Sequence, residues 1–105
     1  MKTQLKNEKV CVTSLKLLGD FWTLRIIGAL GDGEVRYCEL QRRIGNVNPV
    51  TLTSRLKKLE DARLVTRINE PHNKVAVSYS LTELGHAALP VLNAVNRFSD
   101  KAALA

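Results

Sequence analysis

The chain has 105 residues, of which 45% are hydrophobic, and a formal net charge of +6. These values indicate one small globular domain and exclude a disordered chain. No run reaches the roughly 20 apolar residues of a membrane span, and residues 1–9 have no apolar core for export. We therefore expect a cytoplasmic protein that does not bind membranes. Two cysteines are too few for a disulfide scaffold, and neither His nor Cys has metal-ligand spacing, so we expect no metal and no cofactor.

The N-terminal part of the chain predicts two helices. Thr13 can cap a short helix that ends at Gly19, and Asp20 can cap a second helix that ends at residues 31–33. In the second helix, Trp22 begins an apolar pattern at spacings of three and four, so we expect its ring in the core. The apolar residues of the two helices are Leu15, Leu17, Leu18, Trp22, Ile26, Ala29 and Leu30.

A helix-turn-helix order follows. Residues 36–45 predict a short helix with Leu40 and Ile44 on one face and Gly45 as its stop. Cys38 beside Leu40 is expected in the core. A turn over residues 45–47, which contains a glycine, then leads into the next helix, as in the helix-turn-helix motif. Residues 35–37 can pair as a short third strand.

The second helix of this pair begins with a strong start signal. Asn48 can cap the free amides, and Pro49 suits the first helical position. A narrow apolar stripe follows, and the opposite face is polar and basic, which suits the DNA major groove. The alternative to a DNA-binding helix is a helix whose polar face is simply solvated on the surface of a small domain. The stripe consists of Leu52, Leu56, Leu59 and the stem of Arg63.

A β-hairpin is predicted directly after this helix. Residues 64–68 and 75–81 are rich in β-branched and aromatic residues, and a turn cluster over residues 70–74 separates them. A hairpin in this place is a wing. Between Arg36 and Arg67 there are eight basic and three acidic residues, a local charge of +5. Such a concentration of positive charge is typical of a nucleic-acid surface.

The last helix is predicted to begin at Thr82 and to carry a continuous apolar stripe over about four turns. Pro90 falls inside it, and proline removes the hydrogen bond to residue 86, so we expect a kink. The stripe is long for so small a domain. Either it caps the core or it pairs with the same helix of a second chain.

These elements together resemble the HxlR-type winged-helix transcriptional regulators of bacteria and archaea, over roughly residues 10–98. The resemblance rests on the ordered set of motifs and not on any single one. Four places depart from the usual family pattern: Cys11-Val12-Thr13 replaces Cys-Pro-Val, Gly19-Asp20-Phe21-Trp22 replaces Gly-Gly-Lys-Trp, Arg63 replaces a glycine, and His72-Asn73-Lys74 at the wing tip replaces a proline pair. The matching motifs are Cys11 before the first helix, Leu18-Gly19, Trp22-Thr23-Leu24, Arg36-Tyr37, Glu39-Leu40, Thr51-Leu52-Thr53, Arg55-Leu56-Lys57, Leu59-Glu60, Leu64-Val65, Arg67, Val77, Tyr79-Ser80-Leu81-Thr82, Gly85 and Leu89-Pro90-Val91-Leu92.

The resemblance implies an α+β, mostly α fold: a single winged helix-turn-helix domain with a two- to three-stranded β wing and terminal dimerisation helices. The helix-turn-helix is expected at about residues 37–62, the wing at 64–81 and the C-terminal helix at 82–104. In the family the N- and C-terminal helices form a homodimer. The expected dimer interface consists of Leu15, Leu84, Ala88, Val91, Leu92, Val95 and Phe98.

The function we expect is that of a dimeric, sequence-specific regulator of transcription that binds double-stranded DNA. The expected DNA-binding residues are Arg36, Val50, Thr51, Ser54, Arg55, Lys57, Lys58, Arg67, His72, Asn73 and Lys74. Arg55 lies toward the buried side of its helix, so the alternative for it is an ion pair with Glu39 or Glu60. Asn48 is expected to act as a cap. No set of residues resembles a catalytic site.

Two alternatives remain open at this stage. The chain can be a winged-helix module that binds protein and not DNA, although the concentrated charge argues against that reading. Cys11 can be a redox-sensing thiol, because some members of the resembled family sense oxidants with a cysteine at this place, or it can be a small apolar residue at the dimer seam. The sequence does not identify a small-molecule effector.

Overall fold

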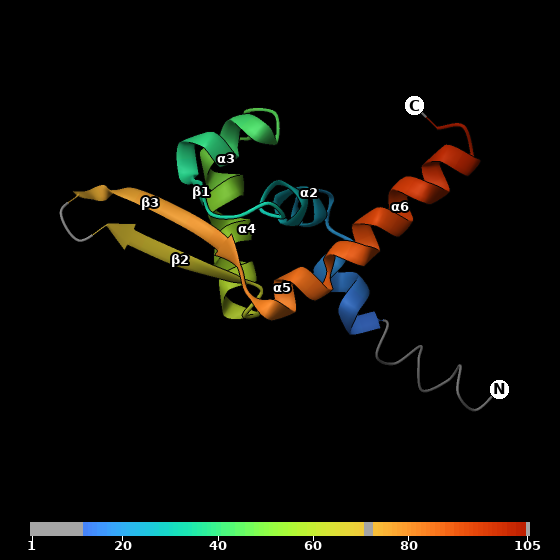
Figure 1. Cartoon of the computed structure of the whole chain (residues 1–105), viewed down its shortest axis with the longest axis horizontal. Helices are drawn as coiled ribbons and strands as arrows, with labels where there is room; N and C mark the ends of the chain where they lie inside the picture. The colour runs from blue at the N-terminus through green and yellow to red at the C-terminus, as the bar shows by residue number, and fades with distance from the viewer. Residues whose placement is uncertain (1–11, 71–72, 105) are drawn as a thin grey trace.

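Helices surround one end of a three-stranded sheet in the computed structural model, which describes residues 12–70 and 73–104 and, for residues 73–75, the backbone alone (Figure 1). The chain is mostly helical and the sheet is antiparallel, as the sequence predicts. In chain order the elements are a helix over residues 12–18, α2 (Phe21–Ala29), β1 (Val35–Arg36), α3 (Tyr37–Arg43), α4 (Pro49–Asp61), β2 (Val65–Glu70), β3 (Asn73–Leu81), α5 (Glu83–Ala87) and α6 (Leu89–Lys101).

The sheet has the strand order β1-β3-β2, so the predicted third strand is present beside the hairpin. Tyr79 on the central strand lies opposite Val35 on one side and Arg67 on the other. Arg36 pairs with Ser78 in extended conformation, and α3 therefore begins at Tyr37, one residue later than predicted. The β2–β3 hairpin extends away from the helices as a wing (Figure 1).

The three predicted leucines of α4 form the centre of the core, and each is at most 1% exposed. Arg63 does not join them, because α4 ends at Asp61 and Arg63 is exposed. Arg63 instead adopts a left-handed backbone with φ of 63°. This conformation costs a residue with a β-carbon about 1 kcal/mol, and glycine adopts it freely. The position is the one where the resembled family usually has glycine.

A close contact joins the end of α4 to the start of α5. The Thr82 hydroxyl donates to the Arg63 carbonyl oxygen at 2.6 Å and accepts from the Gly85 amide at 3.1 Å. The Thr82 amide donates to the Leu64 carbonyl oxygen at 3.0 Å. Gly85 lies so close to Leu64 that a β-carbon there would overlap the Leu64 carbonyl oxygen. These contacts set the direction in which the chain leaves the sheet.

The C-terminal region is broken where Pro90 predicts a kink. The single expected helix consists of α5 and α6, which meet at Ala88, and Pro90 lies in the first turn of α6. Ala88 is only 6% exposed and belongs to the core, so its assignment to the dimer interface is wrong. Leu92 is half-buried and its side chain lies directly against Gly28 of α2. The rest of the stripe is exposed: Leu84, Val91, Val95 and Phe98.

The N-terminal helix differs from its predicted start. Residue 12 is already helical, so Thr13 lies inside the helix and does not cap it. Leu15 on this helix is exposed, and Cys11 lies outside the described residues. The helix over residues 12–18 and α6 lie at the end of the molecule opposite the wing (Figure 1). In the described parts of the chain, no helix has the length and apolar character needed to cross a membrane.

Candidate nucleic-acid interface

Local hydrogen bonds fix the start of α4 and the turn before it. The Asn48 side-chain oxygen accepts the Val50 amide at 2.7 Å, so Asn48 is the cap that the sequence predicts. Gln41 of α3 donates to the Val47 carbonyl oxygen at 2.8 Å across the turn. Gly45, with φ of 90°, supplies the left-handed conformation that the turn needs. The buried leucine face of α4 therefore leaves the opposite face open to solvent.

An ion pair fastens the middle of α4 to α2. The Arg55 guanidinium donates to the Asp20 carboxylate at 2.9 Å, so Arg55 does pair with an acidic residue, but with neither Glu39 nor Glu60. The same carboxylate oxygen caps α2 by accepting the Trp22 and Thr23 amides and the Thr23 hydroxyl. The spacing of residues along the chain could not predict this partner, because Asp20 and Arg55 are 35 positions apart.

The Asp20 carboxyl makes stability depend on pH. Burial alone would raise the pKa of Asp20, but the hydrogen bonds from Arg55 and Thr23 and the Arg55 charge hold it below its ordinary value of 3.8. Because the pKa of Asp20 is lower in the folded state than in the unfolded state, its ionised carboxylate contributes to the free energy of unfolding. This contribution is complete above the unfolded pKa and is lost as the pH falls through the folded pKa. We expect Asp20→Asn to keep the cap but to lower the free energy of unfolding by about 1 kcal/mol at neutral pH.

Urea titrations at pH 7 and at about pH 2.5 check this expectation. The difference between the parent and Asp20→Asn should shrink as the pH falls through the folded pKa of Asp20, where the carboxylate becomes neutral. A difference that is equal at both pH values would mean that the carboxylate charge is not the source of the effect.

The exposed front of α4 carries most of the predicted contact residues. Val50, Ser54, Lys57 and Lys58 are exposed, whereas Thr51 is half-buried. Thr53, which is not among the predicted DNA-binding residues, is exposed beside them. Thr53 lies on the side of α4 that faces the wing. This side belongs to the proposed contact surface only because the wing lies next to it, and the sequence of α4 alone does not show that.

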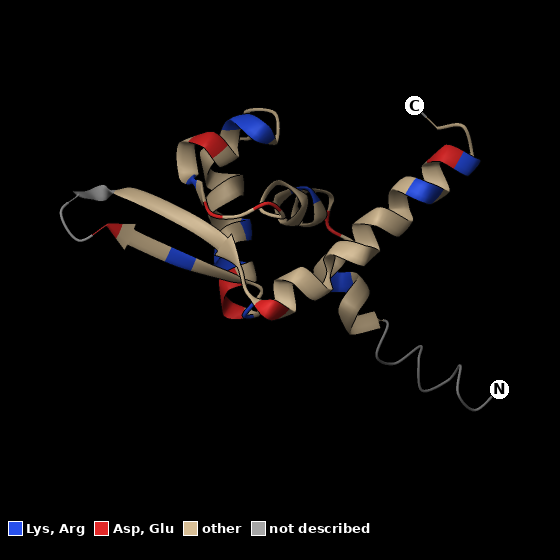
Figure 2. Ribbon diagram, in the orientation of Figure 1, with Lys and Arg blue, Asp and Glu red and all other residues tan. Residues whose placement is uncertain are grey.

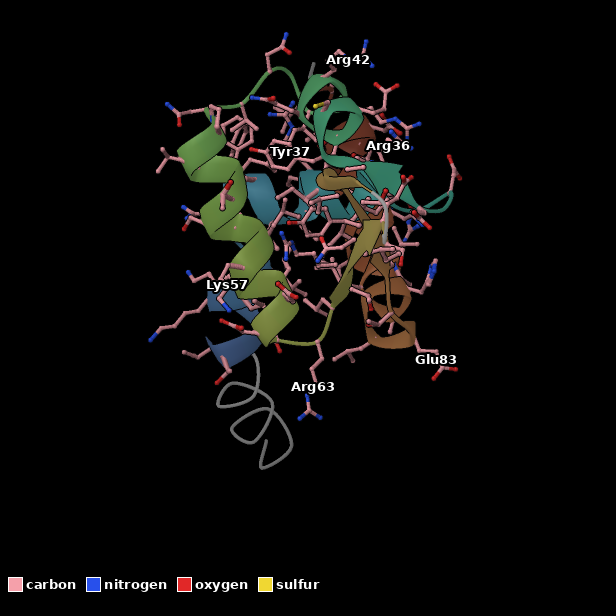
Figure 3. All side chains as sticks on the ribbon, turned by 90° about the vertical axis from the view of Figure 1, so that its left-hand side faces the viewer. Arg36, Tyr37, Arg42, Lys57, Arg63 and Glu83 are labelled. Carbon is pink, nitrogen blue, oxygen red and sulfur yellow. The ribbon has the colours of Figure 1, made fainter. Side chains whose placement is uncertain are left out.

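A cleft of about 840 Å³ separates α4 from the sheet. Figure 3 looks at it from the wing side, with α4 along one wall and Tyr37 pointing between α4 and the sheet. The Tyr37 hydroxyl lies 3.4 Å from the Thr53 hydroxyl. Cys38 is exposed and lines the cleft, so the prediction that it lies in the core is wrong. The charged residues of the lining are Arg36, Lys57, Arg67 and Glu60.

Tyr79 at the back of the cleft stays uncharged at neutral pH. Burial raises the pKa of its phenol, and the neighbouring Arg67, which lies opposite it on β2, opposes this rise only in part. The lining therefore carries three cations against the single carboxylate of Glu60. An anion that enters the cleft meets these three cations, of which Arg36 and Lys57 are paired with carboxylates just outside the lining, and the hydroxyls of Tyr37 and Thr53.

The exposed cations differ in the partners they have. Arg36 pairs with Glu70 at 2.8 Å, and Lys57 pairs with Asp61 at 3.3 Å. Both pairs are exposed and therefore weak, so a phosphate can replace the carboxylate at little cost. Figure 2 shows basic residues on α3, α4 and β2. Within residues 12–70 and 73–104, Lys58 and Arg67 form no ion pair, and both are exposed.

The fold brings the predicted contact residues into two groups. His72 lies outside the described residues, and only the backbone of Asn73 and Lys74 is described, at the start of β3. Of the other predicted residues, the fold brings Arg36, Lys57 and Arg67 together around the cleft. It brings Val50 and Ser54 together on the outer face of α4. Arg55 lies apart from both groups, on the side of α4 that contacts α2.

Comparison with known proteins identifies this arrangement. The model of the HxlR-like helix-turn-helix family matches residues 17–104. The chain belongs to the HxlR-like helix-turn-helix family. It is 35% identical over 89 residues to the HTH-type transcriptional regulator YodB of Bacillus subtilis, which covers 85% of this chain and 80% of YodB. It is also 35% identical over 91 residues to an HTH-type transcriptional regulator of Methanothermobacter thermautotrophicus, covering 85% of this chain and 70% of that protein.

Solved structures of other regulators have the same fold. Reduced YodB from B. subtilis matches with a TM-score of 0.74 at 35% identity, over 85% of this chain and 87% of that one. Quinone-bound and diamide-treated YodB both match with a TM-score of 0.72. The redox regulator HypR in its oxidised form matches with a TM-score of 0.77 at 26% identity, over 87% of this chain and 94% of that one.

Membership of this family confirms the resemblance stated from the sequence and the winged helix-turn-helix fold. HxlR-like proteins are DNA-binding transcriptional regulators and not enzymes. In these terms α3 and α4 form the helix-turn-helix, with α4 as its second helix, and β2 and β3 form the wing.

Proposed function

We propose that this chain is a homodimeric, sequence-specific regulator of transcription whose α4 enters the DNA major groove. The observation that carries the proposal is the exposed polar front of α4 beside a cationic cleft. An α-helix fits the major groove, and the residues at its front then meet the base edges. Val50 and Ser54 are the proposed base contacts, with Thr51 at the edge of the contact surface.

The cleft is the proposed binding site for the sugar-phosphate backbone of the DNA. With α4 in the major groove and the wing at the adjacent minor groove or backbone, the strand between them passes along the cleft. Lys57 and Arg67 supply positive charge from opposite walls, and Tyr37 and Thr53 supply hydroxyls that can donate to phosphate oxygens. Lys58 and Arg36 extend the positive surface, while His72, Asn73 and Lys74 are proposed contacts of the wing tip.

Arg55 is proposed to position α4 and not to contact DNA. Its guanidinium is already bound to Asp20 at 2.9 Å, and both side chains are less than one-third exposed. Breaking a partly buried pair to reach a phosphate costs more than using an exposed lysine. The role of this arginine is therefore to hold the recognition surface at a fixed angle to α2.

The homodimer is proposed to form through the exposed apolar residues of the terminal helices. Val91, Val95 and Phe98 are 40%, 46% and 64% exposed, and α6 has no buried residue. Leu15 on the helix over residues 12–18 and Leu84 on α5 are exposed too. A contiguous apolar stripe of this kind is typical of a protein interface. A two-fold dimer would place half-sites about 10 base pairs apart, or a multiple of that, centre to centre.

Lysine variants test the DNA interface. We expect Lys57→Ala and Lys58→Ala to weaken binding to all sequences and to lower the slope of log affinity against log salt by about 1 each, because each loses a phosphate contact. Fluorescence anisotropy with a labelled duplex at several salt concentrations measures both quantities. Lys101→Ala, which removes the same charge from the far end of α6, is the matched control and should leave the slope unchanged.

Unchanged affinity and slope in both α4 variants would contradict the proposed interface. Binding to a protein partner without any binding to DNA would instead support the alternative of a winged-helix interaction module.

A response to oxidants is the second proposal, and similarity to YodB and HypR supports it. Cys11, outside the described residues, is the proposed sensing thiol, and its modification would move the N-terminal helix against the dimer mate. We expect diamide or a quinone to lower DNA affinity at least tenfold in the parent and in Cys38→Ser, and to have no effect in Cys11→Ser. Anisotropy before and after treatment measures this. Equal affinity throughout would remove the thiol switch and leave Cys11 as a packing residue.

A further inference from the structure

Val50 is an apolar residue in the middle of a polar surface. Its side chain is 77% exposed, the largest exposure among the large hydrophobic side chains of the described residues. It lines a shallow hollow on the outer face of α4, and the other residues of that hollow are Pro49, Thr53, Ser54 and Lys57. On a wheel of 100° per residue, Val50 lies about 160° from Leu52 of the buried stripe. It therefore points straight away from the core and does not contribute to it.

The backbone around Val50 is held firmly. Its amide donates to the Asn48 side chain at 2.7 Å, and Pro49 has a fixed φ. A valine in a helix has one strongly preferred side-chain rotamer, because it is branched at the β-carbon. The two methyl groups therefore have a fixed position and lose little entropy when they are covered. A rigid apolar group is suited to a partner with its own fixed apolar group.

The surroundings of Val50 identify that partner as DNA. Lys57 and Lys58 are exposed on the same face, and the cationic cleft adjoins it through Thr53 and Lys57. Positive charge around a small apolar spot complements a polyanion with an apolar group in its groove. In the major groove that group is the 5-methyl of thymine. Val50 lies in the first turn of α4, and the first residues of a recognition helix contact the base edges.

We propose that Val50 contacts the 5-methyl group of a thymine and makes this chain select that base at one position of each half-site. The inference rests on the proposed DNA-binding function and names one determinant of its specificity. Covering one methylene-sized group contributes about a factor of four in affinity. Replacement of the critical thymine by deoxyuridine, which lacks only the methyl, should therefore weaken binding about fourfold in one half-site.

The experiment begins with a duplex that the parent protein itself selects from a randomised pool. Each thymine of one half-site is then replaced singly by deoxyuridine, and affinities are measured for the parent, Val50→Ala and Val50→Thr. We expect one of these replacements to weaken binding by the parent about fourfold and to have no effect on binding by Val50→Ala. Val50→Thr keeps one methyl group and the shape of valine, so it should keep part of the discrimination.

Lys58→Ala is the matched control on the same helix. It should weaken binding to the thymine and deoxyuridine duplexes by the same factor, because a phosphate contact does not sense the methyl. Since Val50 is exposed, its variants should melt within a few degrees of the parent, and thermal denaturation checks that they are folded.

Three results would overturn the proposal, and they differ from a failure of the proposed function. Selection that yields a consensus without thymine, no effect of any deoxyuridine, or an effect that persists undiminished in Val50→Ala would each reject the Val50 contact while DNA binding remains. Absence of any DNA binding by the parent would reject the proposed function itself.

Discussion

Replacement of Val91 and Val95 with aspartate should convert the proposed dimer into monomers and weaken DNA binding at least a hundredfold. Both side chains are exposed on α6, and two buried charges in the centre of an apolar interface would be unpaired. A dimer binds its second half-site at a high effective concentration, which contributes a factor of 10² to 10⁴, and a monomer loses that factor. Light scattering at micromolar concentration and anisotropy with the selected duplex measure the two effects.

Aspartates at Asn93 and Asn96 are the matched control. They add the same charge on the opposite side of the same helix, where both residues are exposed, and should leave the dimer intact. A parent chain that is monomeric at micromolar concentration would contradict the dimer, and so would DNA binding by the Val91 and Val95 variant at the affinity of the parent.

Gly85→Ala should lower the free energy of unfolding by about 3 kcal/mol or more, and the melting temperature by more than about 10 °C. The added β-carbon would overlap the Leu64 carbonyl oxygen and would lie 3.0 Å from the Leu81 side chain. The first obstacle is backbone, so α5 must move away from the end of α4. Without the overlap, alanine in a helix would stabilise the fold by about 1 kcal/mol, so the sign of the change is diagnostic.

Thermal and urea denaturation measure the effect, and His86→Ala is the control. His86 is the exposed neighbour of Gly85 in α5, and its replacement should change the free energy of unfolding by no more than about 0.5 kcal/mol. An unchanged or more stable Gly85→Ala protein would show that the close approach of α5 to Leu64 is wrong.

Local patterns were sufficient to predict most of the fold. The Asn48-Pro49 start of α4 and its leucine stripe depend on neighbours in sequence, and both are as predicted. The alternation in the wing and the kink at Pro90 are likewise local features. Local patterns do not predict how the elements are arranged or what the protein binds. The family resemblance predicted both, as a winged helix-turn-helix fold and a DNA-binding function.

Features that depend on tertiary packing were missed. Asp20 is far from Arg55 in sequence, so their pair could not be found by spacing. Ala88 has the same helical spacing as the exposed apolar residues, but it lies at the break between α5 and α6 and its side chain is buried in the core. Cys38 is exposed because the side of α3 that carries it faces the cleft, whose other wall is contributed by residues up to 41 positions later in the chain.

The most direct test of the account is binding to genomic DNA of the source organism. Purified protein is incubated at low salt with fragmented genomic DNA, and the complexes are separated by mobility shift and their fragments are sequenced. We expect discrete complexes on a small set of fragments that share a two-fold symmetric site, with an affinity that falls steeply as salt rises. No complex with any fragment at low salt would contradict it.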